Sequence, residues 1–276
     1  MIDYTIDDLK TLMARLREPV YGCPWDQAQT YATIAPSTLE EAYEVVDTIE
    51  QGEPQQLKEE LGDLLFQVIF YSQLGSEESV FDFDEIVSSL TAKLIRRHPH
   101  VFPEGTLASR IDPALVGFDD REAMIKASWE SIKQEEREQK GQCGLLDDVP
   151  LAFPALLRAG KLQKRAARVG FDWPTSQGVY DKLNEEIAEL KEAQASANQQ
   201  HIEEELGDLL FTVVNLARHL KLDPESALRR ANQKFESRFN KLESFAKTQG
   251  QILADSSKHI KAEQLEQWWK EAKASE

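Results

Sequence analysis

The sequence has 276 residues, with 49 acidic side chains against 32 basic ones and a formal net charge of −17. This length is typical of about two domains, each large enough to bury its own core. The acidic balance argues against a general binder of long nucleic acid, because the phosphate backbone would be repelled, and against a polybasic membrane-binding surface. A small polyphosphate could bind only through metal ions or through a local group of Lys and Arg side chains.

The sequence contains no pattern typical of export or of a membrane span. Its N-terminal residues lack a basic region followed by an apolar run, and no window approaches the roughly 20 apolar residues of a spanning helix. Cys23 and Cys143 stand alone, without metal-binding spacing, so we expect reduced thiols and no disulfide. We therefore expect a cytoplasmic protein that does not contact a membrane.

Apolar residues recur at helical spacing along most of the chain, and strand signals are scarce. In chain order, the pattern predicts helices at 5–17, 31–51, 55–74, 83–97, 121–140, 152–168, 176–196, 199–221, 224–248 and 262–274. The fold class is therefore expected to be all-α.

Start and stop signals support several of these helices. Ser37, three residues before Glu40, predicts a capping box, and Asp223 followed by Pro224 predicts a helix start. Residues 98–120 and 141–154 are rich in helix-breaking residues and predict irregular segments. We place a domain boundary in the second of these.

One eight-residue segment occurs twice in the sequence. Residues 59–66, EELGDLLF, recur unchanged as residues 204–211, an offset of 145 (204 minus 59). The same offset pairs three upstream carboxylates without a gap, namely Glu40, Glu41 and Glu44 with Glu185, Glu186 and Glu189. The repeat indicates two copies of one helical domain, at 1–145 and 146–276.

The repeated carboxylates predict a metal site in each copy. Residues three apart share a helix face, and a short connection at 52–54 makes the two acidic helices an antiparallel hairpin. Carboxylates that converge between helices repel one another unless cations lie among them. All-oxygen ligands favour Mg²⁺, with Mn²⁺ as an alternative. The carboxylates of the predicted sites are Glu41, Glu44, Glu60 and Asp63 in the first copy and Glu186, Glu189, Glu205 and Asp208 in the second.

The alternative is that these carboxylates are simply solvated, as most charged residues are. However, the helix that contains Asp63 is apolar nearly all round, which predicts burial in a bundle or in a subunit interface. A buried carboxylate is costly unless it is paired or metal-bound. A di-iron site is disfavoured, because no histidine has a Glu three residues before it.

The motif Glu-Glu-x-x-Glu followed by Glu-x-x-Asp, complete in both copies, resembles the signature of the MazG family of all-α nucleoside triphosphate pyrophosphohydrolases. Four further stretches resemble tandem-domain bacterial members: 22–26 (GCPWD), 93–102 (KLIRRHPHVF), 169–173 (VGFDW) and 231–239 (ANQKFESRF). The resemblance covers nearly the whole chain. It implies two helical-bundle domains, a homodimer, and Mg²⁺-dependent hydrolysis of NTPs or dNTPs to a nucleoside monophosphate and pyrophosphate.

The resemblance also implies roles for individual residues. The four carboxylates of each predicted site would be metal ligands, and Glu185 and Glu40 would orient water or the ligands. Phosphate-binding candidates are Lys182, Lys234 and Arg238, with Lys93, Arg96 and Arg97 as counterparts in the first copy. Trp269 and Lys273 resemble a segment that closes over the nucleotide, with the Trp ring stacking on the base. The alternatives are surface ion pairs for the basic residues and a docking anchor for Trp269.

The two copies are not equivalent. In the first, Pro99 and Pro103 end the basic helix, whereas the second continues to its Trp-bearing tail, so we expect catalysis in the second. His201 lies where relatives often have Lys. A catalytically idle nucleotide-binding regulatory protein and a helical scaffold remain alternatives, but two complete carboxylate sets favour the enzyme.

Overall fold

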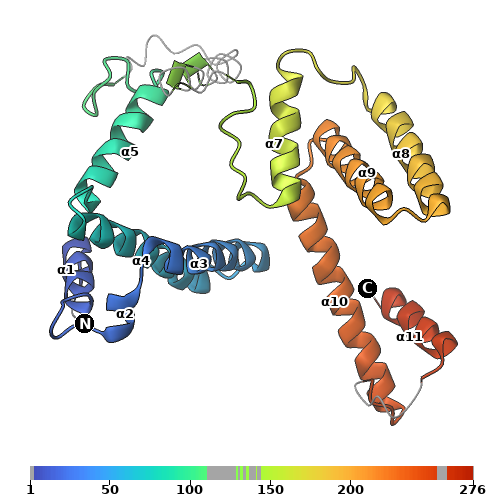
Figure 1. Ribbon diagram of the computed structural model, residues 1–276. Coiled ribbons are helices and arrows are strands. Elements are labelled where there is room, and N and C mark those ends of the chain that lie inside the picture. Colours follow the sequence, from blue (N-terminus) through green and yellow to red (C-terminus); the bar gives the residue numbers. More distant parts are fainter. Residues whose placement is uncertain are drawn as a thin grey trace. The chain divides into compact units, whose positions relative to one another are not determined.

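The computed structural model describes residues 3–110, 129, 131–132, 135–136, 141, 144–253 and 260–275. Their contacts divide the chain into Met1–Glu135 and Glu136–Glu276, which we name unit 1 and unit 2. Every regular element in these residues is a helix, which confirms the all-α prediction (Figure 1). The boundary between residues 145 and 146 stays a prediction.

Unit 1 is organised around a helical hairpin. Its helices are α1 (Ile6–Leu16), α2 (Pro24–Ala28), α3 (Tyr31–Gln51), α4 (Pro54–Glu77) and α5 (Phe83–Arg97). α3 and α4 pack side by side, and α1 and α5 each contact α4. Gly52 closes the hairpin at a φ of 76°, a left-handed conformation that suits glycine. The buried core residues are Met13, Ile34, Ile69, Phe70 and Leu74.

α3 starts where the sequence predicts, but its N-cap differs from the expectation. The N-cap is Thr30, whose side chain accepts a hydrogen bond from the Thr33 backbone N–H, and the Thr33 hydroxyl accepts one from the Thr30 backbone N–H. Ser37 lies inside the helix, so the predicted capping box at Ser37 was wrong. Pro36 is the sixth residue of α3, so the Ala32 carbonyl lacks the intrahelical hydrogen bond that a backbone N–H at position 36 would donate.

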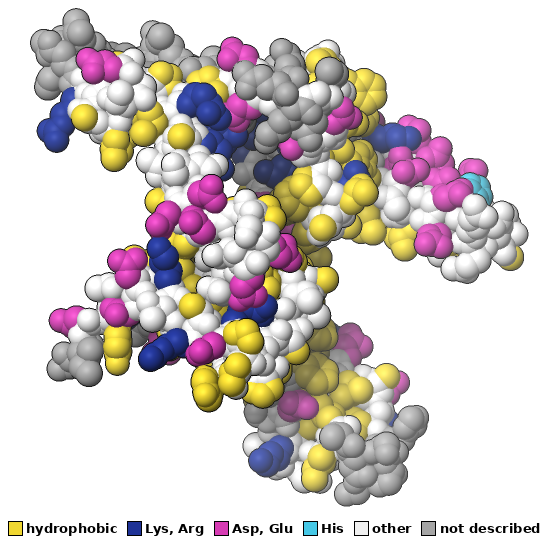
Figure 2. All heavy atoms as spheres, turned by 60° about the vertical axis from the view of Figure 1, so that its left-hand side comes forward, with side chains coloured by type: hydrophobic (Ala, Val, Ile, Leu, Met, Phe, Trp, Pro, Cys, Tyr) yellow, Lys and Arg dark blue, Asp and Glu magenta, His cyan; other side chains and the backbone are white. Residues whose placement is uncertain are grey.

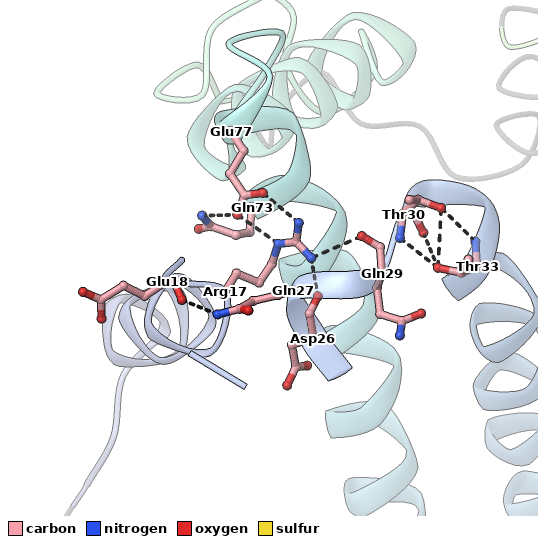
Figure 3. A network of polar contacts seen from close by, with 9 residues as sticks. All are labelled: Arg17, Glu18, Asp26, Gln27, Gln29, Thr30, Thr33, Gln73 and Glu77. Carbon is pink, nitrogen blue, oxygen red and sulfur yellow. Dashed lines mark hydrogen bonds and ion pairs between the residues drawn. The ribbon is translucent and has the colours of Figure 1, made fainter. Parts of the chain in front are cut away.

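A polar network centred on Arg17 holds the segment that leads into α3 (Figure 3). The Arg17 guanidinium donates Nε to Glu77 Oε1 at 2.9 Å and Nη2 to Glu77 Oε2 at 2.8 Å. Its third nitrogen, Nη1, donates to the backbone carbonyls of Asp26 and Gln29. A Cβ on Gly22 would lie 2.4 Å from the Leu16 carbonyl, so this close turn requires glycine. The residues of the GCPWD stretch are thereby fixed against α1 and α4.

Unit 2 repeats the hairpin and adds a long helical pair. Its helices are α7 (Ala155–Ala167), α8 (Ser176–Ser196), α9 (Gln199–His219), α10 (Pro224–Thr248) and α11 (Ala262–Ala274). α8 packs against α9, α9 and α10 contact α7, and α11 packs against α10. The Asn198 side chain caps α9 by accepting from the backbone N–H groups of Gln200 and His201.

The contact between α10 and α11 has its own small core. Trp268 is fully buried against Leu242 and Ala246. Its neighbour Trp269 is only partly buried and packs on the edge of the same cluster. The docking anchor of the last helix is therefore Trp268, whereas sequence analysis had considered Trp269 for that role.

Most helix predictions are confirmed, and five helices have the predicted bounds, namely 31–51, 83–97, 176–196, 224–248 and 262–274. The helix predicted at 121–140 falls almost wholly outside the described residues. α2 was missed, because its five residues are too short to show a helical period.

No helix in the described part of the chain is long and apolar enough to span a membrane. Cys23 is a free thiol, and Cys143 lies outside the described residues.

Candidate active site

The hairpin of unit 2 brings three carboxylates together. Glu186 on α8 and Glu205 and Asp208 on α9 have ligand oxygens that all lie within 4.8 Å of one another, and we name this group cluster 2. Acidic side chains gather over this hairpin in Figure 2, at the upper right. Only 4% of the Glu186 side chain is exposed, so its charge is largely removed from water. A desolvated carboxylate of this kind needs a cation beside it.

The hairpin of unit 1 forms a similar group with a different membership. Glu41 and Glu44 on α3 and Glu60 on α4 also have ligand oxygens within 4.8 Å of one another, and we name this group cluster 1. Burial raises the pKa of the Glu41 carboxyl above its usual range, and the charges of Asp63 and Glu44 raise it further. The Glu41 carboxyl therefore resists ionisation unless a cation compensates for its charge.

The two clusters do not contain every predicted ligand. Asp63 is exposed and lies outside the group of three in cluster 1, although its charge still acts on Glu41. Glu189 lies outside the group of three in cluster 2, and burial is the main cause that raises its pKa. Spacing of i and i+3 puts two side chains on one helix face but does not make them equidistant from the opposing helix.

Lys182 provides the cation of cluster 2. Its Nζ lies 2.6 Å from Glu185 Oε1, 2.8 Å from Glu186 Oε1 and 3.9 Å from Glu189 Oε2. Hydrogen bonds to Glu185 and then Glu186 raise the pKa of the Lys182 ammonium above its usual range, so it is charged at neutral pH. The predicted phosphate-binding lysine and the water-orienting candidate Glu185 thus lie at the edge of the carboxylate group.

His201 also contacts cluster 2. Its Nε2 lies 3.0 Å from Glu205 Oε1, and the two residues are one helical turn apart on α9. The equivalent position in unit 1, Gln56, donates to Glu60 at 3.3 Å. His201, at the position where MazG-family sequences often have Lys, therefore places an imidazole beside the predicted metal ligand Glu205.

The donor set of both clusters suits Mg²⁺ or Mn²⁺. All the ligands are carboxylate oxygens, which hard divalent ions prefer. Two oxygens bound to one Mg²⁺ ion at about 2.1 Å lie no more than about 4.2 Å apart, close to the spacing present here before any ion binds. Oxygens up to 4.8 Å apart would have to approach one another for all three carboxylates to bind one ion.

The remaining predicted nucleotide-binding residues lie on α10 and α11. Lys234 is exposed and Arg238 half-buried. The Trp269 ring lies 5.4 Å from that of Phe235, and Lys273 Nζ lies 5.8 Å from the Trp269 ring centroid. The principal contacts of α11 are with α10, and among the described residues no contact of Trp269 or Lys273 with cluster 2 is found, whereas α10 itself contacts α9.

The counterparts in unit 1 lie on α5, which contacts α4. These are Lys93, Arg96 and Arg97.

The sequence did not indicate how the segment before α8 is anchored to α9. The Asp172 carboxylate accepts hydrogen bonds from Arg218 and from His219 Nε2, the latter at 2.9 Å, and the Arg218 contact lowers the pKa of Asp172 most. This anchor supports a pocket of about 280 Å³ that is lined by Gly170, Phe171, Asp172, Trp173 and Pro174. The VGFDW stretch marked this segment in the sequence, but its spacing could not show that Asp172 binds Arg218 and His219.

Two repeated helical hairpins, each with a carboxylate group able to hold a divalent ion, define a duplicated all-α protein with paired metal-site candidates. A family model described as the MazG nucleotide pyrophosphohydrolase domain matches the chain twice, at residues 29–102 and 175–242. Each match contains one complete hairpin. The chain belongs to the MazG family of nucleotide pyrophosphohydrolases.

Relatives extend this likeness over nearly the whole chain. A nucleoside triphosphate pyrophosphohydrolase of Escherichia coli is 48% identical over 273 residues, which are 98% of each protein. A nucleoside triphosphate pyrophosphohydrolase/pyrophosphatase MazG of Thermotoga maritima is 39% identical, over 98% of this chain and 96% of its own. The protein YabN of Bacillus subtilis is 37% identical over the full chain, which spans 53% of YabN. The likeness to the first two relatives thus covers both units of this chain.

Proposed function

We propose that cluster 2 is the catalytic centre of this pyrophosphohydrolase and cleaves NTPs or dNTPs between the α and β phosphates. The products would be a nucleoside monophosphate and pyrophosphate, and the ion would be Mg²⁺, with Mn²⁺ able to replace it. The observation that supports this choice is the lysine at cluster 2. Lys182 adds a cation for phosphate to a carboxylate group, a combination that cluster 1 lacks among the described residues.

The side chains of unit 2 divide the task between them. Glu186, Glu205 and Asp208 would hold the metal, with Glu189 joining after a small movement. The ion would neutralise charge on the phosphates and lower the pKa of a bound water molecule. Glu185, which is half-exposed at 56%, would accept a hydrogen bond from the attacking water. Lys182 would contact the phosphate oxygens.

We propose that residues on α10 and α11 complete the nucleotide-binding site. Lys234 and Arg238 would bind phosphate, and Trp269 and Lys273 would close over the base. Because α11 packs mainly on α10, Trp269 and Lys273 would reach cluster 2 after a rearrangement of α11 or from a second copy of the chain.

The homodimer is supported by an apolar stripe that the duplication preserves. Leu61, Leu65 and Val68 are 49%, 38% and 36% exposed, and they lie one after another along α4. Their equivalents on α9, Leu206, Leu210 and Val213, are 46%, 50% and 46% exposed. Figure 2 shows hydrophobic side chains at the surface of both units. Contiguous exposed apolar surface of this kind marks an interface, and light scattering after size-exclusion chromatography would give twice the chain mass.

The reaction is tested by its products. The protein is incubated with ATP or a dNTP and Mg²⁺, and the products are separated and identified. Nucleoside monophosphate with pyrophosphate is the expected pair, whereas nucleoside diphosphate with phosphate would contradict the proposal. Binding without turnover would favour the alternative, a catalytically idle nucleotide-binding regulatory protein. A cytoplasmic location, where nucleoside triphosphates and reduced thiols such as Cys23 occur together, belongs to the same proposal.

A further inference from the structure

Lys182 lies where the charge of cluster 2 would otherwise be uncompensated. It contacts Glu186, a member of the cluster, and Glu185, and it lies 3.9 Å from Glu189. About a third of the Lys182 side chain is exposed, at 32%, whereas Glu186 is 4% exposed. The ammonium therefore approaches the carboxylates from the solvent side of the site.

The helix itself gives little reason for this contact. A Lys that precedes a Glu by four residues has the weaker of the two orientations for a helical ion pair. Exposed Lys side chains also lose rotational freedom when they are held in one place. The convergence of several carboxylates on one ammonium is what stabilises the position, and a divalent ion would bind to the same charge.

A metal ion and the ammonium compete for Glu186. An ion bound to a Glu186 oxygen at about 2.1 Å would lie within roughly 7 Å of an ammonium still paired with that carboxylate, so the two cations would repel each other. The cost disappears if the ammonium swings away, because the long Lys side chain is flexible. A triphosphate in the site would supply new oxygens to receive it.

Unit 1 provides the internal comparison. The position equivalent to Lys182 is Ser37, and among the described residues no Lys, Arg or His side chain forms an ion pair with cluster 1. Cluster 1 thus has the same kind of carboxylate group without a competing ammonium.

We propose that Lys182 is a displaceable counter-ion: it occupies cluster 2 until a divalent ion binds, and its release towards the phosphates couples metal binding to nucleotide binding. This inference rests on the proposed function, since it assumes that cluster 2 binds a metal and a triphosphate. Lys182 acts here as a positioning residue as well as a phosphate ligand. Cluster 1, which has a serine at this position, lacks the coupling.

The test measures metal affinity rather than turnover. Mg²⁺ is titrated by calorimetry into the full chain with Glu44→Gln and Glu60→Gln, so that the signal comes from cluster 2. Each titration is made without nucleotide and with saturating α,β-methylene ATP, which cannot be cleaved between the α and β phosphates. The same titrations are made after adding Lys182→Met, and separately Lys182→Gln in case one variant folds poorly.

The expected result has two parts. Without nucleotide, Lys182→Met should tighten Mg²⁺ binding by at least about fivefold, the lower end of typical couplings between sites. The factor by which the analogue improves Mg²⁺ affinity should also fall about fivefold. The reason is that the variant has no ammonium that repels the ion and that the phosphates could draw away. Lys191→Met makes the same charge change about 13 Å further along α8 and should alter neither quantity.

Three results would overturn the inference. Unchanged Mg²⁺ affinity in Lys182→Met and Lys182→Gln would mean that the lysine binds phosphate without competing for the cluster. Weaker Mg²⁺ affinity would mean that the ion pair supports the metal site. If the background protein binds no Mg²⁺ with or without the analogue, the inference falls together with the metal-dependent function, a result that product identification reveals separately.

Discussion

Position 37 in unit 1 is a serine, whereas its equivalent in unit 2 is Lys182, whose ammonium contacts Glu185 and Glu186. Similar differences surround the two clusters: Gln56 contacts Glu60 in unit 1, and His201 contacts Glu205 in unit 2. The carboxylates themselves recur at the same spacing. The duplicated hairpins therefore share the spacing of their carboxylates along the sequence, but they bring different members of the set together and differ in the cationic side chains beside them.

Each hairpin is also anchored by an ion pair near the end of its second helix. In unit 1 Arg17, directly after α1, pairs with Glu77 at the end of α4. In unit 2 Arg218 near the end of α9 pairs with Asp172 in the loop before α8. The two pairs do not lie at positions related by the offset of 145 residues. The duplicated hairpins are therefore anchored by ion pairs that differ in both position and polarity.

The largest expected effect separates the two clusters by activity. Glu205→Ala and Asp208→Ala should each lower kcat/KM for ATP or a dNTP by at least about a thousandfold, because a lost metal ligand removes several kcal/mol of charge stabilisation in the transition state. Glu60→Ala and Asp63→Ala are the matched controls and should leave turnover largely intact. Equal losses in both units would show that both clusters catalyse or that both are needed for assembly.

A second prediction separates the two adjacent tryptophans of α11. Trp268→Ala should lower the free energy of unfolding by about 3–5 kcal/mol, because it empties the core between α10 and α11. Trp268→Phe should cost less, since the buried indole N–H has no hydrogen-bond partner among the described residues. Trp269→Ala should cost less still and should mainly weaken nucleotide binding. Denaturant titration and binding assays of the three variants distinguish these roles, and equal destabilisation by both Ala changes would contradict the assignment.

A third prediction places the lysine in unit 1. In the full chain with cluster 2 disabled by Glu205→Gln and Asp208→Asn, Ser37→Lys should weaken Mg²⁺ binding at cluster 1 by about fivefold, because an ammonium would compete with the ion. Ser37→Met is the control for side-chain size. Calorimetric titration measures both, and an unchanged affinity in the Lys variant would show that position 37 does not reach the cluster.

The smallest expected effect concerns acid stability. Arg218 and His219 lower the pKa of Asp172 below the ordinary value of 3.8 for an aspartate. The ionised carboxylate therefore stabilises the folded state above this value, and the contribution is lost as the pH falls through the lower, folded-state pKa. Asp172→Asn should cost about 1 kcal/mol near neutral pH.

The difference between wild type and this variant should shrink below about pH 4. Denaturant unfolding at a series of pH values checks it, and a difference that grows in acid would contradict the assigned sign. Arg17 likewise lowers the pKa of Glu77 in unit 1, so Glu77→Gln should show the same sign with a smaller amplitude, since that carboxylate is more exposed.

Much of the fold could be predicted because it depends on local patterns. Helical periodicity gave the bounds of α3 and α8, and the repeated carboxylates gave both hairpins. The N-cap of α3 could not be predicted, because Thr30 and Ser37 both offer capping hydroxyls and only the backbone geometry selects Thr30. α2 was missed because five residues cannot display a period.

The candidate site could be predicted in its parts but not in its arrangement. The i and i+3 spacing correctly paired Glu205 with Asp208 on one face of α9, yet it could not show that Glu189 lies outside the group of three. Distances across a hairpin depend on how the helices cross, which the spacing along one helix does not determine. The contact of Lys182 with three carboxylates is likewise a property of the assembled side chains.

The most direct test of the difference between the two hairpins is a crystal structure of the full chain with Mn²⁺ and α,β-methylene ATP, with the manganese located by its anomalous scattering. We predict manganese and the triphosphate at Glu186, Glu205 and Asp208, with the Lys182 ammonium moved from Glu186 to a phosphate oxygen. A triphosphate bound at cluster 1 alone, or a Lys182 that still pairs with Glu186 beside the bound metal, would contradict the account.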